Sequence, residues 1–434
     1  MTIPTRPPSR FSLRFISGNI LVFASTDLLG NFARSMVFPY SSLYILALGG
    51  NAAQIGLVSF LALLAGLFML PIAGHITDHV DRIRLIALAG FLSSLFLIPT
   101  ILAPNWQIVA IASLLFGLIV FQFPAYSSLV ADSLPPLERG RGLGAMNTIS
   151  SSLAIFAPYL AGLVIERYTA NLGMRILYTA MFVLYLISTV IQLRFLRENS
   201  PTPRQPLKLA DLLRALEQAY GTIPGLIRQM PTPLKALALV VLLSFLANGV
   251  ATAFWVVYAT QQIGLSATEW GLILLIESVV RMATFLPAGL LVDRWGRTKS
   301  LLAALVISMI AQPLFVVCKG FGAILLIRIA IALAFTLAIP ASTALMADLV
   351  PRSLRGQMMA AIGQGGIMIG PAGGGAGGPA LGYLFIPLVM LASLAGGYLY
   401  LLNPAYPWLF TLVATVISIL LALLFLRDPH HAEV

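Results

Sequence analysis

Charged and metal-binding side chains are scarce in this sequence. Asp, Glu, Lys and Arg make up only 9% of the 434 residues, and there is one cysteine, Cys318. A single cysteine excludes an internal disulfide and any cysteine cluster for zinc or iron–sulfur. The four histidines, His75, His79, His430 and His431, lie in predicted loops or at the C-terminal end and form no metal-binding or nucleophilic group. We expect no metal, no cofactor and no enzymatic site, and the absence of a phosphate-binding loop argues against ATP-driven transport.

Long apolar stretches are what the sequence has instead. Hydrophobic residues make up 59% of the chain, and its mean hydropathy of +0.94 is far above that of a soluble protein. A membrane-spanning helix needs about 20 apolar residues. No period-2 alternation of the kind found in membrane barrels is present, so the spans are predicted to be helices. Candidate spans recur along the whole chain: Ile55–Ile72, Leu85–Leu102, Ile108–Val130, Leu177–Leu193, Leu234–Val257, Leu301–Val317 and Leu409–Leu426.

Basic residues are distributed unevenly between the predicted loops. The formal net charge of +11 would suggest a nucleic-acid partner in a soluble protein. Here the basic residues gather in alternate loops, and the intervening loops hold little beyond Arg167, Arg175 and Lys319. Because such residues accumulate in cytoplasmic loops, we predict a cell-membrane protein with both termini in the cytoplasm, an even number of spans and no nucleic-acid partner. We see no cleavable signal peptide at the N-terminus.

The sequence also contains an internal duplication. AGHITDHVDRIRLIAL at 73–88 corresponds to AGLLVDRWGRTKSLLA at 288–303, at a shift of 215 positions. ADSLPPLERGRG at 131–142 corresponds in the same way to ADLVPRSLRGQM at 347–358, and the glycine pair Gly49 and Gly56 to Gly264 and Gly271. Matches in the same order at nearly one shift predict a duplicated half of about six spans, and about twelve spans in total.

Five segments follow from this organisation. A polar, proline-rich stretch, RENSPTPRQP, begins after Leu196 and marks the seam between the halves. Apolar residues at helical spacing after it predict an amphipathic helix on the cytoplasmic face. The predicted segments are a cytoplasmic tail at 1–15, a six-helix bundle at 16–196, a linker at 197–233, a second six-helix bundle at 234–427 and a cytoplasmic tail at 428–434.

The duplicated charged motif resembles that of a known family. GLLVDRWGRTK (Gly289–Lys299) is similar to the G-x-x-x-D-R-x-G-R-[RK] signature between helices 8 and 9 of the major facilitator superfamily. GHITDHVDRIR (Gly74–Arg84) is a degraded copy, with His79 in place of the usual arginine and Asp81 in place of the usual glycine. The resemblance covers nearly the whole chain. It implies an all-α membrane protein of two pseudo-symmetric six-helix bundles that moves a small molecule by alternating access.

The resemblance also implies a gating role for the charged motif. Asp78 and Asp293 are expected to accept backbone N–H groups at a neighbouring helix N-terminus, and the motif's glycines to allow close backbone approach. Arg82 and Arg297 are expected to reach the carboxylates that end helices 4 and 10. The alternative is that these basic residues only hold their loops in the cytoplasm. The expected gating residues are Gly74, Asp78, Arg82, Asp132, Arg139, Gly289, Asp293, Arg294, Gly296, Arg297, Asp348 and Arg355.

Glycine and proline stretches are expected in helices 5 and 11. GGIMIGPAGGGAGGPALG at 365–382 is assigned to helix 11, where small residues allow close packing and proline causes bends. Ala157-Pro158 with Ala161-Gly162 resembles a worn form of the motif that antiporters of the family carry in helix 5. The expected bends are at Pro158, Gly370 and Pro371. We further expect residues 384–403 to form an extended or re-entrant element on the outer side.

Ionisable residues inside the predicted spans carry the most functional information, because each is costly in hydrocarbon. Asp27, Asn31 and Arg34 share one face of helix 1, with Asp27 about 16 Å into the membrane. Glu277 and Arg281 form an i, i+4 pair in helix 8. We assign proton coupling to Asp27 and Glu277. We assign the substrate cavity to Asn31, Arg34, Gln122, Asn248, Arg281 and Arg328.

Structural alternatives remain open for these residues. Glu277 and Arg281 could only neutralise each other, and Arg328 could extend to the outer membrane surface. The leading function is a monomeric carrier that exports small amphiphilic compounds in exchange for protons. The alternatives are a carrier that takes up a small organic anion, with Arg34, Arg281 and Arg328 as clamps, and a membrane channel.

Overall fold

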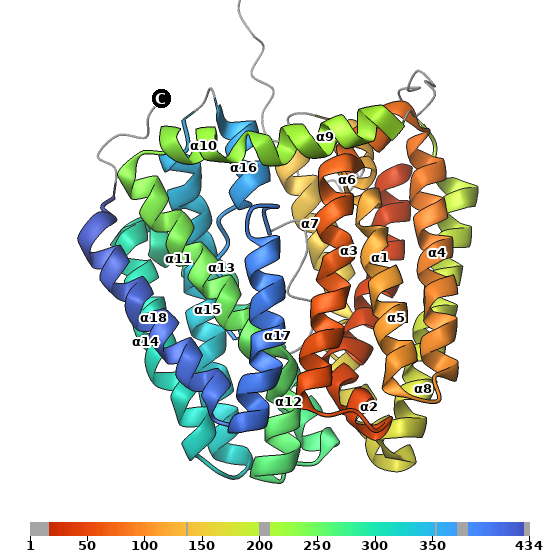
Figure 1. Cartoon of the computed structure of the whole chain (residues 1–434), viewed down its shortest axis with the longest axis vertical. Coiled ribbons are helices and arrows are strands. Elements are labelled where there is room, and N and C mark those ends of the chain that lie inside the picture. The colour runs from red at the N-terminus through yellow and green to blue at the C-terminus, as the bar shows by residue number, and fades with distance from the viewer. Residues whose placement is uncertain (1–16, 136–137, 199–208, 352–353, 371–380, 429–434) are drawn as a thin grey trace, which may run out of the picture.

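The computed structural model describes residues 17–135, 138–198, 209–351, 354–370 and 381–428 (Figure 1). Within these ranges the chain is helical and contains no strand. The same ranges hold nine helices that are long and apolar enough to cross a membrane, together with the shorter apolar helix α17 (Ile386–Leu402). One of the nine, at 139–195, is 57 residues long and crosses twice. The predicted all-helical membrane fold is confirmed.

The first half of the chain runs six times between the two ends of the molecule. Its crossings are formed in chain order by α1 (Asn19–Val37), η2 (Phe38–Tyr40) and α2 (Ser41–Ala47); by α3 (Ala52–His79); by α4 (Arg82–Leu102); by α5 (Trp106–Gly117), η3 (Leu118–Phe121) and α6 (Gln122–Ser133); and by α7 (Arg139–Ser152) and α8 (Ala157–Phe195). Helix α8 supplies both the fifth and the sixth crossing. It turns at Thr169, whose φ of 67° is the one positive value at a non-glycine residue in the described ranges.

The second half repeats this order. It consists of α11 (Thr232–Ala251), η4 (Thr252–Phe254), α12 (Trp255–Tyr258) and η5 (Ala259–Ile263); α13 (Ala267–Trp295); α14 (Arg297–Val317); α15 (Phe321–Leu349); α16 (Arg355–Ile362) and α17; and α18 (Tyr406–Phe425). The equivalent helices α3 and α13 even begin with the same device, a capping box formed by Asn51 with Gln54 and by Ser266 with Glu269. The duplication seen in the sequence is therefore a duplication of structure.

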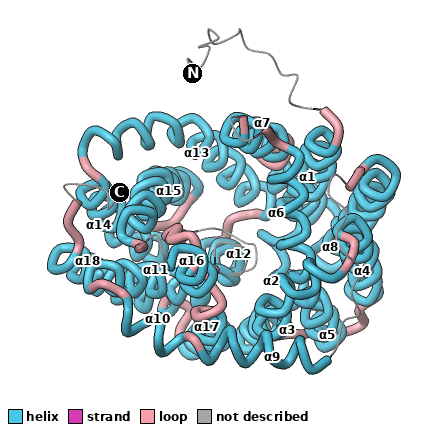
Figure 2. Tube along the Cα trace, turned by 90° about the horizontal axis from the view of Figure 1, so that it is seen from above, coloured by secondary structure: helices cyan, strands magenta, loops and turns pink. Residues whose placement is uncertain are grey.

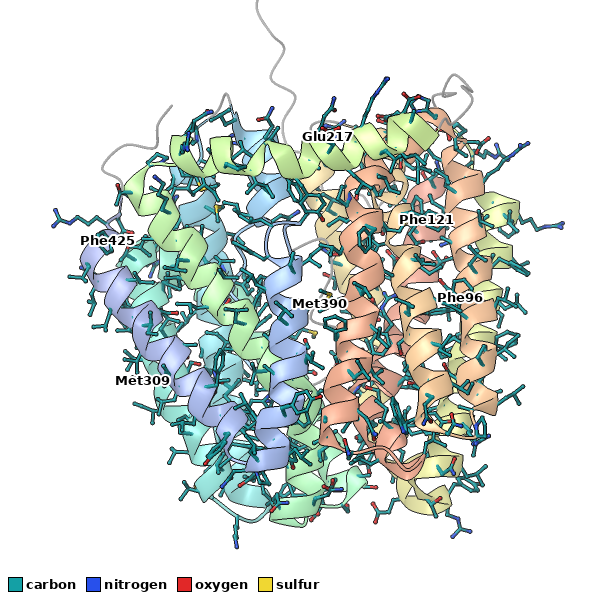
Figure 3. The ribbon with its side chains drawn as sticks, in the orientation of Figure 1. Phe96, Phe121, Glu217, Met309, Met390 and Phe425 are labelled. Atoms are coloured by element: carbon teal, nitrogen blue, oxygen red, sulfur yellow. The ribbon has the colours of Figure 1, made fainter. Side chains whose placement is uncertain are left out.

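Two short helices connect the halves. Helices α9 (Leu209–Gly221) and α10 (Ile223–Gln229) lie at the end of the bundle where the chain enters and leaves it, and we call this the termini end (Figures 1 and 2). Glu217 on α9 marks this end in Figure 3. The Tyr220 hydroxyl donates to the Leu67 carbonyl over 2.7 Å, and the Tyr220 ring lies 5.8 Å from that of Tyr383. Burial raises the pKa of Tyr220 to about 12, so this donor keeps its proton at neutral pH.

The halves meet most closely along α3 and α17. A Cβ added to Gly56 would lie 2.7 Å from the Ser393 carbonyl oxygen, and one added to Gly397 would lie 2.7 Å from the Ala52 carbonyl oxygen. The two helices therefore approach so closely that only glycine fits at each crossing point. Met390, on the same helix α17, lies where the two halves meet in Figure 3.

The equivalent contact joins α8 and α13. A Cβ on Gly271 would lie 2.5 Å from the Pro158 carbonyl oxygen, and one on Gly162 would collide with the Ala267 carbonyl. The buried Tyr40 hydroxyl donates to both of these carbonyls, at 2.8 and 3.1 Å. Both contacts lie near the end opposite the termini. Among the described residues, α6 and α7, which lead to the termini end, share no extensive contact with the second half. The closest contacts between the halves thus lie near the far end, whereas α6 and α7 make no extensive contact with the second half.

Two expectations about the eleventh crossing are wrong. Residues 386–402 are not extended or re-entrant, because they form the regular helix α17 that packs on α3 and α11. Residues 363–370 are not helical, and Gly363, Gly365 and Gly370 have positive φ values that an L side chain rarely adopts. The crossing is broken between α16 and α17. Pro371 lies outside the described residues. Helix α8 begins at Ala157, with Pro158 in its first turn, after a four-residue turn, so the fifth crossing is interrupted near the equivalent point.

Candidate functional site

The first-half site is built on one face of α1. Asp27 accepts a 2.5 Å hydrogen bond from the Tyr126 hydroxyl of α6. One and two turns further along, Arg34 donates to the Asn31 side-chain oxygen at 2.5 Å, and the Asn31 amide nitrogen donates to the Ser150 carbonyl of α7 at 3.3 Å. The predicted face of α1 therefore points at the fourth and fifth crossings. The three predicted residues lie together, and Tyr126 joins them.

Arg34 is the most open member of this site. Its side chain is exposed to solvent, although protein atoms surround it and its electrostatic interactions reach Asp27, Tyr126 and Tyr185. A charged side chain in this position can remain hydrated while its positive charge acts on the Asp27 carboxylate. Asp27 itself is half-buried. A carboxylate with access to water, a hydroxyl donor and a nearby cation can exchange a proton and respond to changes around it.

The sequence alone did not identify Tyr126 as a site residue, although its spacing from Gln122 indicated it. Gln122 was singled out on the fourth crossing, and Tyr126 lies four residues later on the same helical face. Gln122 is half-buried and bonds to none of the described residues. The Tyr126 ring packs edge-on against Phe23 at 4.8 Å, which fixes its hydroxyl toward Asp27.

The second-half site is a buried group of three charges. Arg281 Nη2 lies 2.5 Å from Glu277 Oε1, and Arg328 Nη2 and Nε lie 2.6 and 2.8 Å from Glu277 Oε2. Glu277 is 3% exposed and Arg328 is fully buried at 0%. The Arg328 guanidinium stacks on Trp255 at 4.7 Å and that of Arg281 on Phe335 at 4.3 Å. One carboxylate and two guanidiniums leave a formal charge of +1 inside the second half.

This arrangement corrects one expectation and extends another. Arg328 does not extend to the outer surface, because it is held inside by Glu277 and by Trp255 and Trp270. The predicted i, i+4 pair of Glu277 and Arg281 is present, and Arg328 joins it to form a group of three charges. Two guanidiniums compensate the Glu277 carboxylate, which also has almost no access to water. The geometry therefore favours a structural role for Glu277 over proton exchange.

Asn248 lies apart from these groups, three residues before the end of α11. It lines a pocket that is formed within the second half, described below. Among the residues the structure describes, no group of three His, Cys, Asp or Glu side chains could hold a metal ion.

The expected ion pairs of the charged motif are present at the termini end. Arg82 Nη1 lies 2.7 Å from Asp132 Oδ2, and Arg297 pairs with Asp348. Each pair ties two helices of the same half. The other basic residues of the motif are solvent-exposed: Arg139, Arg294 and Arg355, the last of which donates to the Ala347 carbonyl at the end of α15.

The expected acceptors Asp78 and Asp293 do not cap a helix. Both are exposed, and neither bonds to another residue of the described ranges. Asp428 caps α14 instead, because its Oδ1 accepts from the Thr298 backbone N–H at 2.8 Å and from the Thr298 hydroxyl at 2.9 Å. In the first half Asp81 accepts from the Arg84 N–H at 3.1 Å. A carboxylate thus caps the N-terminus of α4 and that of α14, but it is supplied by Asp81 and Asp428 and not by the expected Asp78 and Asp293.

A sequence signal for Asp428 was available. Each half ends in the same pattern, Phe-Leu-Arg-Glu at 195–198 and Phe-Leu-Arg-Asp at 425–428.

The glycines of the charged motif differ in whether their position requires glycine. Gly74 and Gly289 have open space around them, so the expected close approach is not made there. Gly296 has φ 97°, and a Cβ there would collide with Asp428, so this position requires glycine.

Comparison with known proteins assigns both halves of the chain to the same family. The family model of the Major Facilitator Superfamily matches residues 25–234 and again residues 237–434. The multidrug resistance protein MdtG of Enterobacter lignolyticus is 28% identical over 289 residues, which cover 64% of this chain and 65% of that protein. The chain thus matches just under two thirds of the length of that relative. An uncharacterized MFS-type transporter of Methanocaldococcus jannaschii is 25% identical over 421 residues, 94% of this chain and 95% of that protein.

Solved structures with the same fold are more distant in sequence. The inward-facing, occupied form of a bacterial homologue of the human lysosomal transporter Spinster superposes with a TM-score of 0.68 at 15% identity, covering 97% of this chain and all of that one. The nucleoside transporter NupG superposes with a TM-score of 0.64 at 14% identity, covering 94% of this chain and 98% of that one. At these identities the likeness is one of fold.

Proposed function

The chain belongs to the Major Facilitator Superfamily, and from this premise we propose that it exports small amphiphilic compounds in exchange for protons. The observation that carries the proposal is the Asp27 site, in which a half-buried carboxylate lies between the Tyr126 hydroxyl and the charge of Arg34. Coupling requires a group whose proton binding differs between two states. The α1 face meets α6 and α7, the helices that are free of extensive contact with the second half, so movement of the halves would change the surroundings of Asp27.

The direction of transport rests on two supports. Some relatives of the chain are named as multidrug resistance proteins. The basic residues also gather at the termini end, which we propose faces the cytoplasm of a cell-membrane protein. Because the closest contacts between the halves lie near the other end, we propose that this is the state that loads cargo from the cytoplasm. We propose that the carrier acts as a monomer.

A second candidate has its own support. The interior charges of the second half sum to +1, and Arg34 adds an exposed guanidinium in the first half. These groups favour a carrier for a small organic anion. The two candidates differ in the charge of the cargo, so one experiment separates them.

We expect a pH gradient across proteoliposomes to drive tetraphenylphosphonium, a lipophilic cation, against its own concentration gradient. The membrane potential is clamped at zero with potassium and valinomycin, so that voltage cannot move the cation. Addition of a protonophore should abolish the accumulation. If benzoate accumulates above its level in protein-free liposomes, into which neutral benzoic acid diffuses by itself, and tetraphenylphosphonium does not, the second candidate is favoured. If neither compound responds to the pH gradient, proton-coupled transport of both classes is contradicted.

The glycine contacts between the halves give a further prediction. We expect Gly271→Leu to prevent closure at the far end, because even a Cβ there meets the Pro158 carbonyl at 2.5 Å. Spin labels at Leu172 and Gln261, in a Cys318→Ser background, should then show a longer distance by electron paramagnetic resonance. Gly289→Leu is the matched control, since it lies on the same helix with open space around it. Equal distances in the two variants would contradict the assignment of Gly271 to the closed far-end contact.

A further inference from the structure

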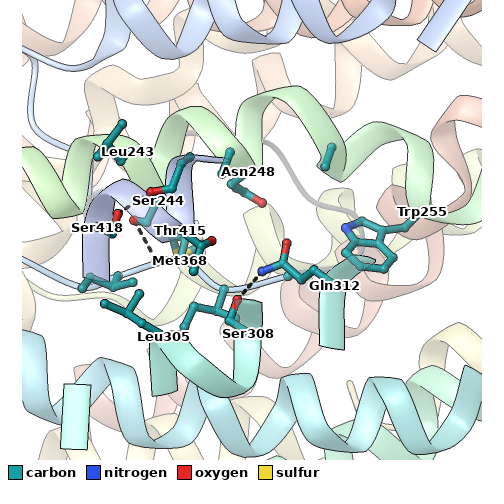
Figure 4. Close-up of a pocket in the computed structure, with 16 residues that line it drawn as sticks. Leu243, Ser244, Asn248, Trp255, Leu305, Ser308, Gln312, Met368, Thr415 and Ser418 are labelled. Carbon is teal, nitrogen blue, oxygen red and sulfur yellow. Dashed lines mark hydrogen bonds between the residues drawn. The ribbon is translucent and has the colours of Figure 1, made fainter. Parts of the chain in front are cut away.

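A polar pocket lies inside the second half, away from the Asp27 site. Its walls come from α11, α12, α14, α18 and the non-helical segment 367–370 (Figure 4). No residue of the first half lines it. The pocket is thus formed within one half and is separate from the site built on α1.

Three helices turn polar faces toward this pocket. Helix α11 contributes Ser244 and Asn248, α14 contributes Ser308 and Gln312, and α18 contributes Thr415 and Ser418. Each pair is three or four residues apart, which places both members on one helical face. None of the lining side chains is ionisable. Uncharged polar groups that converge in the interior of a membrane protein are costly unless they have a partner.

Two of these side chains lack part of their hydrogen bonding. Asn248 Oδ1 accepts from the Thr252 hydroxyl, and Gln312 Nε2 donates to the Ser308 hydroxyl. Asn248 Nδ2 and Gln312 Oε1 have no partner among the described residues, although both side chains are only 6% exposed. Figure 4 shows the two side chains directed into the space between α11 and α14. The pocket therefore offers a free donor on one wall and a free acceptor on the opposite wall.

The surroundings of the pocket select against cations. Trp255 lines the pocket, and the buried Arg328 guanidinium lies 4.7 Å from its ring centre. A Cβ on Gly370, another lining residue, would lie 3.8 Å from Arg328 Nη1, an atom without a hydrogen-bond partner in the described ranges. The net positive charge of this group repels a cation, and the lining side chains themselves carry no charge.

We propose that this pocket is a ligand site for the uncharged amide or ureide group of a small molecule. The amide oxygen accepts from Asn248 Nδ2, the amide N–H donates to Gln312 Oε1, and the flat group packs on Trp255. An amide carries a donor and an acceptor side by side, which matches the two free groups of the pocket. The site does not depend on the proton coupling proposed for Asp27.

The test uses three probes of nearly the same shape: benzamide, benzoate and benzamidinium. With the purified full-length protein we expect benzamide to raise the Tm, and Asn248→Leu or Gln312→Met to remove that rise. Gln192→Met, which removes a glutamine in the first half, should leave the rise intact. Any effect of benzoate should be the same in wild type and in the two pocket variants, because it arises elsewhere.

A labelling measurement tests the site without altering its amides. Leu243→Cys places a thiol on the pocket wall in a Cys318→Ser background. We expect benzamide to slow its reaction with N-ethylmaleimide several-fold, and benzamidinium to leave the rate unchanged. The proposal is overturned if benzamide neither stabilises the protein nor slows the reaction. It is also overturned if Asn248→Leu and Gln312→Met retain the full stabilisation, or if benzamidinium protects the thiol as well as benzamide does.

Discussion

Glu277→Gln is expected to lower the free energy of unfolding by about 3–5 kcal/mol, the cost of breaking a buried ion pair by removal of one partner. Glu277 is the single counter-charge found for Arg281 and Arg328 in the described interior of the second half. Its replacement leaves a formal charge of +2 where Arg328 has no contact with solvent. Unfolding of the purified protein in increasing denaturing detergent measures the change, and the yield of monodisperse protein should fall with it.

Two matched variants make this test specific. Glu277→Gln combined with Arg328→Gln returns the formal charge to +1, and should recover most of the lost stability because the amides can bond to each other. Asp293→Asn removes a carboxylate from the same helix α13 at an exposed position without a described partner. That change should stay within about 0.5 kcal/mol. Equal stability of Glu277→Gln and Asp293→Asn would show that the three charges do not act as a buried group.

Asp27→Asn is expected to abolish accumulation driven by a pH gradient while downhill exchange continues. In a one-for-one exchange, a gradient of one pH unit supplies about 1.4 kcal/mol, which supports about tenfold accumulation by the wild type. Asparagine keeps the shape of the side chain and can still bond to Tyr126, but it carries no exchangeable proton. Counterflow of labelled substrate in proteoliposomes, with and without the gradient, measures both activities.

Tyr126→Phe is the control for this prediction. It removes the hydrogen bond to Asp27 and leaves the carboxylate in place. Accumulation should therefore persist, with a shifted pH profile. Asp27 has no coupling role if the asparagine variant still concentrates substrate tenfold under the same gradient.

The sequence predicted what depends on local spacing and on repetition. The face shared by Asp27, Asn31 and Arg34 and the pair of Glu277 and Arg281 follow from the helical period. The duplicated halves followed from the matched motifs. The partnership of Arg328 with Glu277 could not be predicted, because it depends on how α15 is rotated against α13. The hydrogen bond from Tyr126 to Asp27 could not be predicted for the same reason, since the Tyr126 hydroxyl reaches Asp27 from another helix.

The eleventh crossing shows where composition alone fails. Residues 365–382 are assigned to helix 11 and residues 384–403 to an extended or re-entrant element, whereas the regular helix of this crossing lies at 386–402. Gly363, Gly365 and Gly370 adopt backbone conformations that interrupt a helix, whereas the serine side chains Ser342 and Ser244 accept the backbone N–H groups of 367 and 368. Glycine content indicates such a break, but tertiary hydrogen bonds decide its position.

Asp428 follows the last crossing helix, α18, yet it completes the beginning of α14, more than a hundred residues earlier. During synthesis the N–H groups at that helix start stay without this partner until the last crossing has left the ribosome. The N-terminus of α14 therefore obtains this cap only after the last crossing helix has been made. A truncation that removes only 428–434 deletes no crossing helix, but it should leave α14 with a frayed start and mark the nascent protein for degradation.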